Sequence, residues 1–432
     1  MTPPSGRTDD RRRDLLGPAG AARAEALEAA DDVPSRRDRF VVPDGVTYLA
    51  GNSLGLQPRA AREAVEDVLD AWATDAVAAH VQGAHPWMHY HAEMRETVAA
   101  LVGARPGEAV VMNSLTVNLH LLLGSFYRPT STRHRIVIEA DVFPSDRYAV
   151  TNVVRARGFD PAEAVEIMRP RPGERHLRTG DVTGFLDREG GSVAAVVLSA
   201  VDFRTGALLD IPAITAAAHR AGAVIGWDLA HAAGNVPLAL HDWDVDFACW
   251  CHYKYVNAGP GAVGGAFVHE RHGDDPALVR PGGWWGHDPV SRFEMPFAFV
   301  PVPGAEGWQV SNPPILAMAP VRVSLALFAE VGMDALRARS RRLTAFLEAL
   351  LDDVATRHRV EVITPRDPER RGAQLSVVVD DAVRVAAVLY DQHRVRVDER
   401  PPNIIRLAPA PLYNTYVDCW RAAVALDAVL SD

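Results

Sequence analysis

Residues 194–228 read AAVVLSAVDFRTGALLDIPAITAAAHRAGAVIGWD, and this stretch decides the fold. Apolar runs at Ala194–Ser199 and Ala223–Trp227 flank a segment with helical spacing at Ile211–Ala221. Strand, helix and strand in this order predict two parallel strands with the helix packed on one face of their sheet. The second run ends at an acid, Asp228, and His231 follows three residues later.

The same alternation continues on both sides of this stretch and predicts an α/β fold around a mainly parallel sheet. In such folds, sites lie at the carboxyl ends of the strands. Residues 281–314 are rich in Gly, Pro and aromatic residues and predict a long structured loop, and a smaller α+β unit follows it. We expect disorder over residues 1–12, a helix within 13–38, and a strand near Val46 that leads into a helix over 59–79. Further strands are expected at Ala109–Met112 and Arg135–Glu139, with apolar runs at Asp246–Cys249 and Ala262–Val268. Further helices are expected at Val117–Tyr127, Ser145–Arg157, Ile315–Glu330 and Asp334–Arg357.

Composition excludes several classes of function. The 432-residue chain has a formal net charge of −10, which disfavours nucleic acid and anionic membrane as partners. It lacks a run of about 20 apolar residues that could span a bilayer. The three cysteines are an odd number without metal-ligand spacing, so we expect a reducing compartment, the cytosol, and no disulfide framework.

Lys254 is the only lysine in a chain whose Lys+Arg total is 45. Arg serves salt bridges and solubility as well as Lys does, but only the amine of Lys can lose its proton and attack a carbonyl. Lys254 is therefore a candidate Schiff-base lysine. The alternative is that a GC-rich genome replaced the other lysines and one survived by chance.

Asp228 stands 26 residues before Lys254, at the end of a predicted strand. A strand-end carboxylate and a lone lysine suit a pyridoxal-phosphate enzyme, in which the carboxylate keeps the pyridine nitrogen protonated. Thr116 could hold the phosphate at a helix N-terminus, and Phe143 could lie against the flat ring. Alternatively, Asp228 and Thr116 are ordinary caps, and Phe143 belongs to a turn that Pro144 initiates.

Arg406 lies inside an otherwise apolar strand, where an unpaired charge is costly. It is either a carboxylate clamp that faces a cleft or a member of a structural ion pair. The sequence at 259–264 matches GxGxxG but leads into a strand, which argues against a dinucleotide site. His85, His89 and His91 lack a consistent spacing and an acidic partner, so we predict no metal there.

With these residues in place, the chain resembles the kynureninase family, pyridoxal-phosphate hydrolases of fold type I within the class V aminotransferase superfamily. The resemblance runs from about Thr47 to Trp420. It rests on LAGNSLGLQP (49–58), VMNSLTVNLHLLL (111–123), FPSDRY (143–148), IPAIT (211–215), WDLAHAAGNV (227–236), HDWDVDFACWCHYKYVNAG (241–259), GWWGH (283–287), VSNPPI (310–315) and RLAPAPLYN (406–414).

The resemblance implies a role for each matching residue. Lys254 would carry pyridoxal 5′-phosphate as a Schiff base, Asp228 would face the pyridine nitrogen, and Tyr253 would donate protons. The cofactor would also contact Leu115, Thr116, Phe143, Pro144, Ser145, Asp146, Ser199, His231, Tyr253, Trp284 and Asn312, and the substrate would contact Arg406, His80, Ser311, Asn312 and Asn52.

The implied reaction is hydrolytic Cβ–Cγ cleavage of 3-hydroxy-L-kynurenine or L-kynurenine to (3-hydroxy)anthranilate and L-alanine, with His80, Ser311 and Asn312 resembling the 3-hydroxykynurenine-preferring branch. The implied architecture has an arm (residues 1–45), a large cofactor-binding α/β domain with a mainly parallel seven-stranded sheet (46–320) and a smaller α+β C-terminal domain (321–432). The implied assembly is a homodimer with the active site at the subunit interface and Trp284 reaching across it. Alternatives are a cysteine desulfurase-like or other class V enzyme, and a catalytically dead cofactor-binding regulator.

Overall fold

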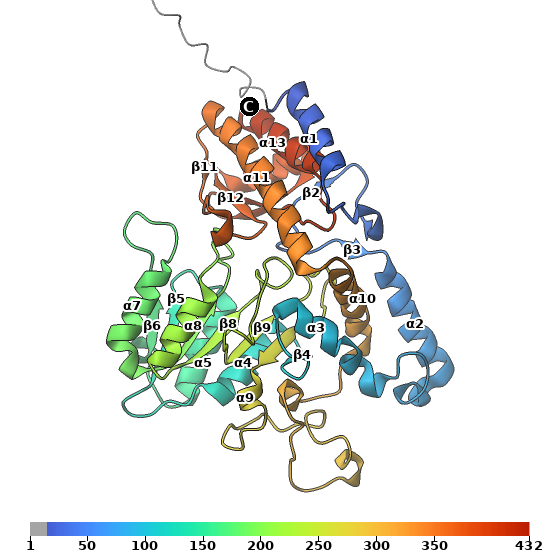
Figure 1. Ribbon diagram of the computed structural model, residues 1–432, viewed down its shortest axis with the longest axis vertical. Coiled ribbons are helices and arrows are strands. Elements are labelled where there is room, and N and C mark those ends of the chain that lie inside the picture. Colours follow the sequence, from blue (N-terminus) through green and yellow to red (C-terminus); the bar gives the residue numbers. More distant parts are fainter. Residues whose placement is uncertain (1–14, 432) are drawn as a thin grey trace, which may run out of the picture.

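The structure, a computed structural model, describes residues 15–431, and the disorder predicted for residues 1–12 lies outside that range. A seven-stranded sheet of order β4-β10-β9-β8-β7-β5-β6 forms its centre (Figure 1). Only β10 runs antiparallel to its neighbours, so the predicted mainly parallel α/β fold is confirmed. The strands are β4 (Ala109–Val111), β5 (Arg135–Glu139), β6 (Val165–Met168), β7 (Val193–Ser199), β8 (Val224–Asp228), β9 (Phe247–Trp250) and β10 (Gly265–Val268).

Helices cover both faces of this sheet, because its strands are apolar on both sides. Side chains of β7 show the division: Val196 and Leu198 belong to one hydrophobic core, and Ala195 and Val197 belong to another. The first core contains residues of α2 (Ala60–Asp75), α3 (Arg95–Val102), α7 (Thr179–Glu189), α8 (Ile211–Arg220) and α10 (Ile315–Val331), and the second contains residues of α4 (Leu115–Phe126) and α5 (Pro144–Ala156).

Most predicted elements begin and end within two residues of the observed bounds. One strand and one helix were not predicted from the sequence. The edge strand β6 (Val165–Met168) and the helix α7 fall in residues 158–192. The β6 sequence is VEIM, and three of its four residues are only half-buried. A short edge strand with a charged residue lacks the continuous apolar run that marked the central strands.

A second, smaller sheet of order β11-β12-β15-β14 belongs to the C-terminal part of the chain. It packs with α11 (Met333–Arg357), α12 (Ala382–His393) and α13 (Tyr416–Ser431) into a separate core. Figure 1 shows α1 (Pro18–Ala30) beside α13, and Leu16 and Ala24 enter that same core. The domain boundaries near residues 45 and 320 remain predictions. The remaining strands are β1 (Phe40–Val41), β2 (Thr47–Tyr48), β3 (Gln57–Pro58), β11 (Glu361–Val362), β12 (Leu375–Val378), β13 (Val395–Arg396), β14 (Asp398–Arg400) and β15 (Ile404–Leu407).

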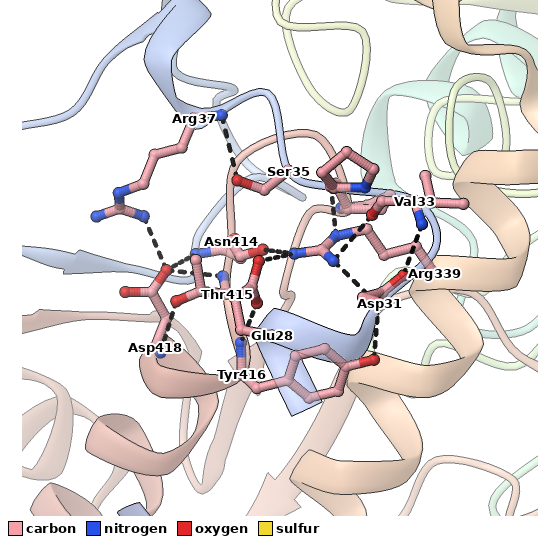
Figure 2. A network of polar contacts seen from close by, with 12 residues as sticks. Glu28, Asp31, Val33, Ser35, Arg37, Arg339, Asn414, Thr415, Tyr416 and Asp418 are labelled. Carbon is pink, nitrogen blue, oxygen red and sulfur yellow. Dashed lines mark hydrogen bonds and ion pairs between the residues drawn. The ribbon is translucent and has the colours of Figure 1, made fainter. Parts of the chain in front are cut away.

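A buried arginine ties the N-terminal segment to α11 and to the loop before α13 (Figure 2). Arg339 is fully buried and lies 3.0 Å from the equally buried Asp31 carboxylate and 2.7 Å from Glu28. It also donates hydrogen bonds to the carbonyl oxygens of Val33, Pro411 and Asn414. This network fixes residues 28–33 against the C-terminal part of the chain.

Replacing Arg339 by methionine is expected to lower the free energy of unfolding by about 3–5 kcal/mol, because it removes the cation shared by Glu28, Asp31 and three backbone carbonyl oxygens, and leaves Asp31 only Arg342 as an ionic partner. Urea unfolding followed by circular dichroism measures the loss. Arg357→Gln is the matched control on the same helix, since Arg357 pairs with Asp427 near the surface and should cost less than about 1 kcal/mol. Equal losses in the two variants would contradict this account.

Within residues 15–431, no single helix has the length and apolar composition to cross a membrane. The helices α10 and α11 pass that test only when taken together, and they meet at an angle of 81°.

Candidate active site

Four polar side chains lie at the carboxyl ends of neighbouring strands. Asp228 ends β8, Ser199 ends β7 beside it in register, and Glu139 ends β5. Lys254 follows β9, the strand on the other side of β8. The structure therefore brings three of the predicted site residues to one edge of the sheet, as the parallel arrangement requires.

The turn that carries Lys254 is held by close backbone packing. The amide of Asn257 donates to the Lys254 carbonyl over 2.9 Å, and Asn257 itself has a positive φ of 64°. The amide of Gly55 donates to the Tyr253 carbonyl over 2.8 Å, and a Cβ at Gly55 would stand 2.5 Å from the Lys254 carbonyl oxygen. Only glycine fits this approach, so the turn at 52–55 positions the lysine.

Asp146, near the start of α5, contacts the carboxylate of Asp228. Burial and the neighbouring Asp228 carboxylate raise the pKa of Asp146 well above its usual range. The second oxygen of Asp146 is buried without a hydrogen-bond partner in the described chain. Among residues 15–431, neither carboxylate forms an ion pair.

The N-terminus of α4 contains Leu115 and Thr116, the predicted phosphate contacts. Its N-cap residue, Ser114, makes no side-chain capping bond, so the amides of the first turn, which contains Leu115 and Thr116, have no side-chain acceptor at the cap. Gly264, the residue before β10, approaches closely, because a Cβ there would lie 3.2 Å from the Leu115 nitrogen. The phosphate-binding role of Leu115 and Thr116 remains a prediction.

Phe143, Phe203, His231 and Tyr255 form a series of ring contacts. Phe143, at the N-cap of α5, is 46% exposed and packs edge-on against Phe203 at 5.5 Å. His231 is buried between Phe203 and Tyr255, and its Nδ1 has no partner in the described chain. Burial, with Lys254 and Arg406 nearby, lowers the pKa of His231 well below its usual range, so its ring is neutral near pH 7.

Arg406 on β15 is buried and paired. Its Nε donates to Asp398 over 2.8 Å from the neighbouring strand β14, and its Nη2 donates to the same carboxylate. Nη1 donates to the Phe203 carbonyl over 2.6 Å, and Nη2 also donates to the Ser53 hydroxyl over 3.0 Å. The ion pair and the carboxylate clamp predicted for Arg406 are therefore compatible. Asp398 holds the guanidinium through Nε and Nη2, whereas Nη1 and Nη2 also point at the Phe203 carbonyl and the Ser53 hydroxyl.

The sequence reading missed Asp398, Phe203 and Glu139. Asp398 stands in a run of charges, VDER, whose pairing partner could be found only from the register of β14 and β15. Glu139 accepts the Ser199 amide over 3.1 Å, and burial raises its pKa to about 7. An acid at the end of a predicted strand was the one available signal for Glu139.

The recorded contacts of His80 and Trp284 are with neighbours in their own segments, and their predicted roles, like those of Ser311 and Asn312, remain predictions. His80 ends the short helix η3 (Ala76–His80) after α2, and its ring packs against Trp87 at 5.1 Å. Trp284 packs edge-on against Phe293 at 5.6 Å in the long loop, and Ser311 and Asn312 are exposed. Figure 1 places α2 at the margin of the molecule, whereas β8 and β9 lie near its centre.

Asn52 is buried, and its Nδ2 donates to Gln374 over 2.9 Å. Its Oδ1 has no partner within the described residues. Asn52 therefore keeps one free acceptor, next to the Ser53 hydroxyl that contacts Arg406.

Comparison with known proteins decides the family. Over 416 residues the chain is 56% identical to a kynureninase from Salinispora tropica, covering 94% of this chain and 96% of that protein. A kynureninase from Myxococcus xanthus is 51% identical over 409 residues, with coverage of 94% and 96%. The chain belongs to the kynureninase family. A family model described as the kynureninase C-terminal domain also matches residues 336–426.

Solved structures with the same fold include enzymes outside the kynureninase family. A cysteine desulfurase from Escherichia coli superposes with a TM-score of 0.74 at 19% identity, covering 91% of this chain and 97% of that one. A mutant of the cystine C–S lyase C-DES with glycine covalently linked to its pyridoxal-phosphate cofactor has a TM-score of 0.72 at 18% identity, covering 90% of this chain and 98% of that one. At these identities the likeness shows the fold alone, and it confirms the predicted fold type.

The residues present fit the cofactor of the kynureninase family. The paired carboxylates of Asp146 and Asp228 suit a protonated pyridine nitrogen, and the uncapped α4 N-terminus suits a phosphate. Lys254 lies in the turn after β9, the strand next to β8, which ends at Asp228.

The pKa of Asp146 makes the apoprotein sensitive to pH. Because this pKa is raised on folding, the group stabilises the fold fully below pH about 4 and loses that contribution as the pH rises toward the folded-state pKa. Asp146→Asn apoprotein should therefore match the wild type near pH 4 and exceed its thermal stability at pH 8. With saturating pyridoxal phosphate at pH 8, the wild type should instead be more stable than Asp146→Asn. Parallel pH profiles of stability for the two apoproteins would contradict the contact between Asp146 and Asp228.

Proposed function

We propose that this chain hydrolyses the Cβ–Cγ bond of 3-hydroxy-L-kynurenine or L-kynurenine, giving 3-hydroxyanthranilate or anthranilate and L-alanine. The observation that carries the proposal is the only lysine of the chain, placed at the strand ends beside the paired Asp228 and Asp146 carboxylates. The 56% identity to a kynureninase over 94% of the chain supports the same reaction.

In this proposal Lys254 holds pyridoxal phosphate, Asp228 with Asp146 faces the pyridine nitrogen, and Leu115 and Thr116 hold the phosphate. Ser145, near Asp146 at the start of α5, and Ser199, beside Asp228 in register, are further polar contacts. The remaining proposed contacts are Phe143 and Pro144 on the ring side, His231 in front of it, and Tyr253 at the phosphate. When bound, the cofactor supplies a ring that accepts electrons from the substrate α-carbon.

Arg406 would bind the substrate α-carboxylate. The side of its guanidinium is held by Asp398, so a carboxylate must approach the end, where the Phe203 carbonyl and the Ser53 hydroxyl now accept hydrogen bonds. The two oxygens of a substrate carboxylate would take the places of the Phe203 carbonyl and the Ser53 hydroxyl. Because they are charged, their hydrogen bonds to Arg406 would be stronger than those of the two neutral acceptors. Asn52 would contact the same end of the substrate.

The chain's own groups would move the protons. The Lys254 amine would take the α-proton of the substrate and later return it to the α-carbon. One water would add its hydroxyl to the γ-carbonyl carbon, the Cβ–Cγ bond would break, and the water proton would restore the hydroxyl of Tyr253 after that hydroxyl has protonated Cβ. Burial and the Cys251 thiol raise the pKa of Tyr253, so its hydroxyl is protonated and can donate a proton to Cβ of the leaving alanine. Neutral His231 donates or accepts a hydrogen bond without adding charge.

A homodimer would complete the site. Residues 293–300 of the long loop expose Phe293, Met295 and Phe297, which a monomer in water would not favour. His80, Trp284, Ser311 and Asn312 lie on peripheral elements, so a second copy is the means of bringing them to the aryl group and phosphate. The proposed order of preference, 3-hydroxykynurenine over kynurenine, rests on His80, Ser311 and Asn312.

The desulfurase alternative is disfavoured by the cysteines. Such an enzyme needs a mobile thiolate, but Cys249, Cys251 and Cys419 are all buried, and burial raises the pKa of each thiol. An inactive regulator would not need an intact Lys254, Asp228 and Arg406. A cytosolic location remains a prediction, with which three free cysteines agree.

Steady-state assays of the holoenzyme with 3-hydroxykynurenine, kynurenine and cysteine test the proposal. We expect L-alanine and one equivalent of the aromatic acid from both kynurenines, with the higher kcat/KM for the 3-hydroxy substrate. Equal or reversed values would remove the substrate preference only. Alanine from cysteine but not from either kynurenine would contradict the proposed reaction itself.

A further inference from the structure

A groove separates the large sheet from the C-terminal part of the chain on the side of α8. Its cavity measures about 450 Å³, which is within the range of small-molecule sites. It lies between the N-terminus of α8 and the first turns of α11. Its apolar wall contains Leu208, Ile211, Pro212, Val236 and Trp243.

Arg337 lines this groove and is only 7% exposed. Its Nη2 donates to the carbonyl oxygens of Arg371, over 2.8 Å, and Pro368. Its Nε and Nη1 have no acceptor among residues 15–431, and the guanidinium forms no ion pair there. Burial, with Arg341 nearby, lowers the pKa of Arg337 to about 10. The nearby Glu369 carboxylate favours this charge, but Arg337 has no ion pair of its own among residues 15–431, so an anionic ligand would supply one.

The other charges at the groove leave it positive. Arg370 is exposed and makes no ion pair within the described chain, whereas Arg341 pairs with Glu369. The Asp210 carboxylate caps α8 by accepting the Ala213 amide over 3.0 Å. Three arginines and two acids line the groove, so its formal charge is +1.

We propose that this groove binds a small aromatic monocarboxylate, with its carboxylate on Arg337 and its ring against Trp243 and Pro212. The net charge of +1, with two acids beside the arginines, favours a monoanion over a phosphate dianion. The apolar wall requires an apolar body, which acetate and phosphate lack. The site is separate from Lys254, and it does not depend on the proposed reaction, although that reaction releases an acid of this class.

Equilibrium dialysis of the holoenzyme with radiolabelled benzoate tests the proposal. Arg337→Gln is the direct variant, but it also removes two hydrogen bonds to backbone carbonyls. The surface double variant Arg341→Gln/Arg370→Gln therefore accompanies it, and Arg357→Gln on the same helix is the control. We expect the wild type and the control to bind one more benzoate per chain than Arg337→Gln, which loses the proposed carboxylate partner. The double variant keeps Arg337 but changes the formal charge of the groove from +1 to −1, so its affinity for benzoate there should fall about tenfold.

The activity assay and two competitors complete the test. The double variant should keep its kcat/KM in the absence of benzoate. Acetate and inorganic phosphate at equal concentration should leave benzoate in place. The proposal is overturned if the double variant binds benzoate as tightly as the wild type does, or if phosphate or acetate displaces the benzoate. It is also overturned if the double variant loses kcat/KM together with benzoate binding, because that result would locate the binding at Lys254.

Discussion

Lys254→Ala holoenzyme is expected to lose turnover of kynurenine by on the order of 10⁴-fold, together with the visible absorption of the bound cofactor. The loss is large because one amine would both hold the cofactor and move the α-proton. No other lysine exists in the chain to replace it. Spectra and single-turnover assays after incubation with pyridoxal phosphate measure both effects.

Lys254→Arg separates charge from chemistry in the same experiment. It keeps the cation but cannot form a Schiff base, so it should be as inactive as Lys254→Ala. Thermal unfolding of both apoproteins should resemble the wild type, since Lys254 makes no ion pair within the described chain. Activity in either variant above about a hundredth of the wild type would contradict the role of Lys254.

Arg406→Gln should reduce kcat/KM by about 10²–10³-fold, because two charge-assisted hydrogen bonds to the substrate carboxylate are lost. Asp398→Asn should raise KM about tenfold while kcat changes less, since the guanidinium remains but loses the carboxylate that orients it. Steady-state kinetics of both variants with kynurenine measure the split between KM and kcat.

The double variant Arg406→Gln/Asp398→Asn tests whether the pair only stabilises the fold. It removes both buried charges, so its stability should exceed that of Arg406→Gln, which leaves Asp398 without Arg406. Its kcat/KM should stay as low as that of Arg406→Gln. Recovery of activity in the double variant would show that Arg406 does not bind substrate.

The central strands were predictable because they are buried on both faces and read as unbroken apolar runs. The strand β5 was placed at its observed bounds, and β7 and β8 within one residue. The strand β6, at the sheet edge, has a half-buried, partly charged sequence and carries no such signal. The place of α1 was also hidden, because the buried ion pair between Asp31 and Arg339 joins residues 308 positions apart.

The site divides in the same way. Asp228 and Lys254 were predictable because each follows a strand that the sequence reveals, and parallel strands bring such ends together. The partner of Arg406 was not predictable, because Asp398 is one acid in a charged run and only the register of β14 and β15 pairs them. His80, Trp284, Ser311 and Asn312 lie outside the strand–helix pattern of the sheet. Hydrophobic periodicity therefore gives no information about their positions relative to Lys254.

Reduction of the holoenzyme with borohydride, followed by proteolysis and mass spectrometry, tests the central claim most directly. Reduction converts a Schiff base into a stable cofactor–amine bond. We expect one cofactor adduct per chain, on the peptide that contains Lys254, and none in Lys254→Ala. An adduct on the N-terminal amine alone, or unmodified Lys254 in a protein saturated with pyridoxal phosphate, would contradict it.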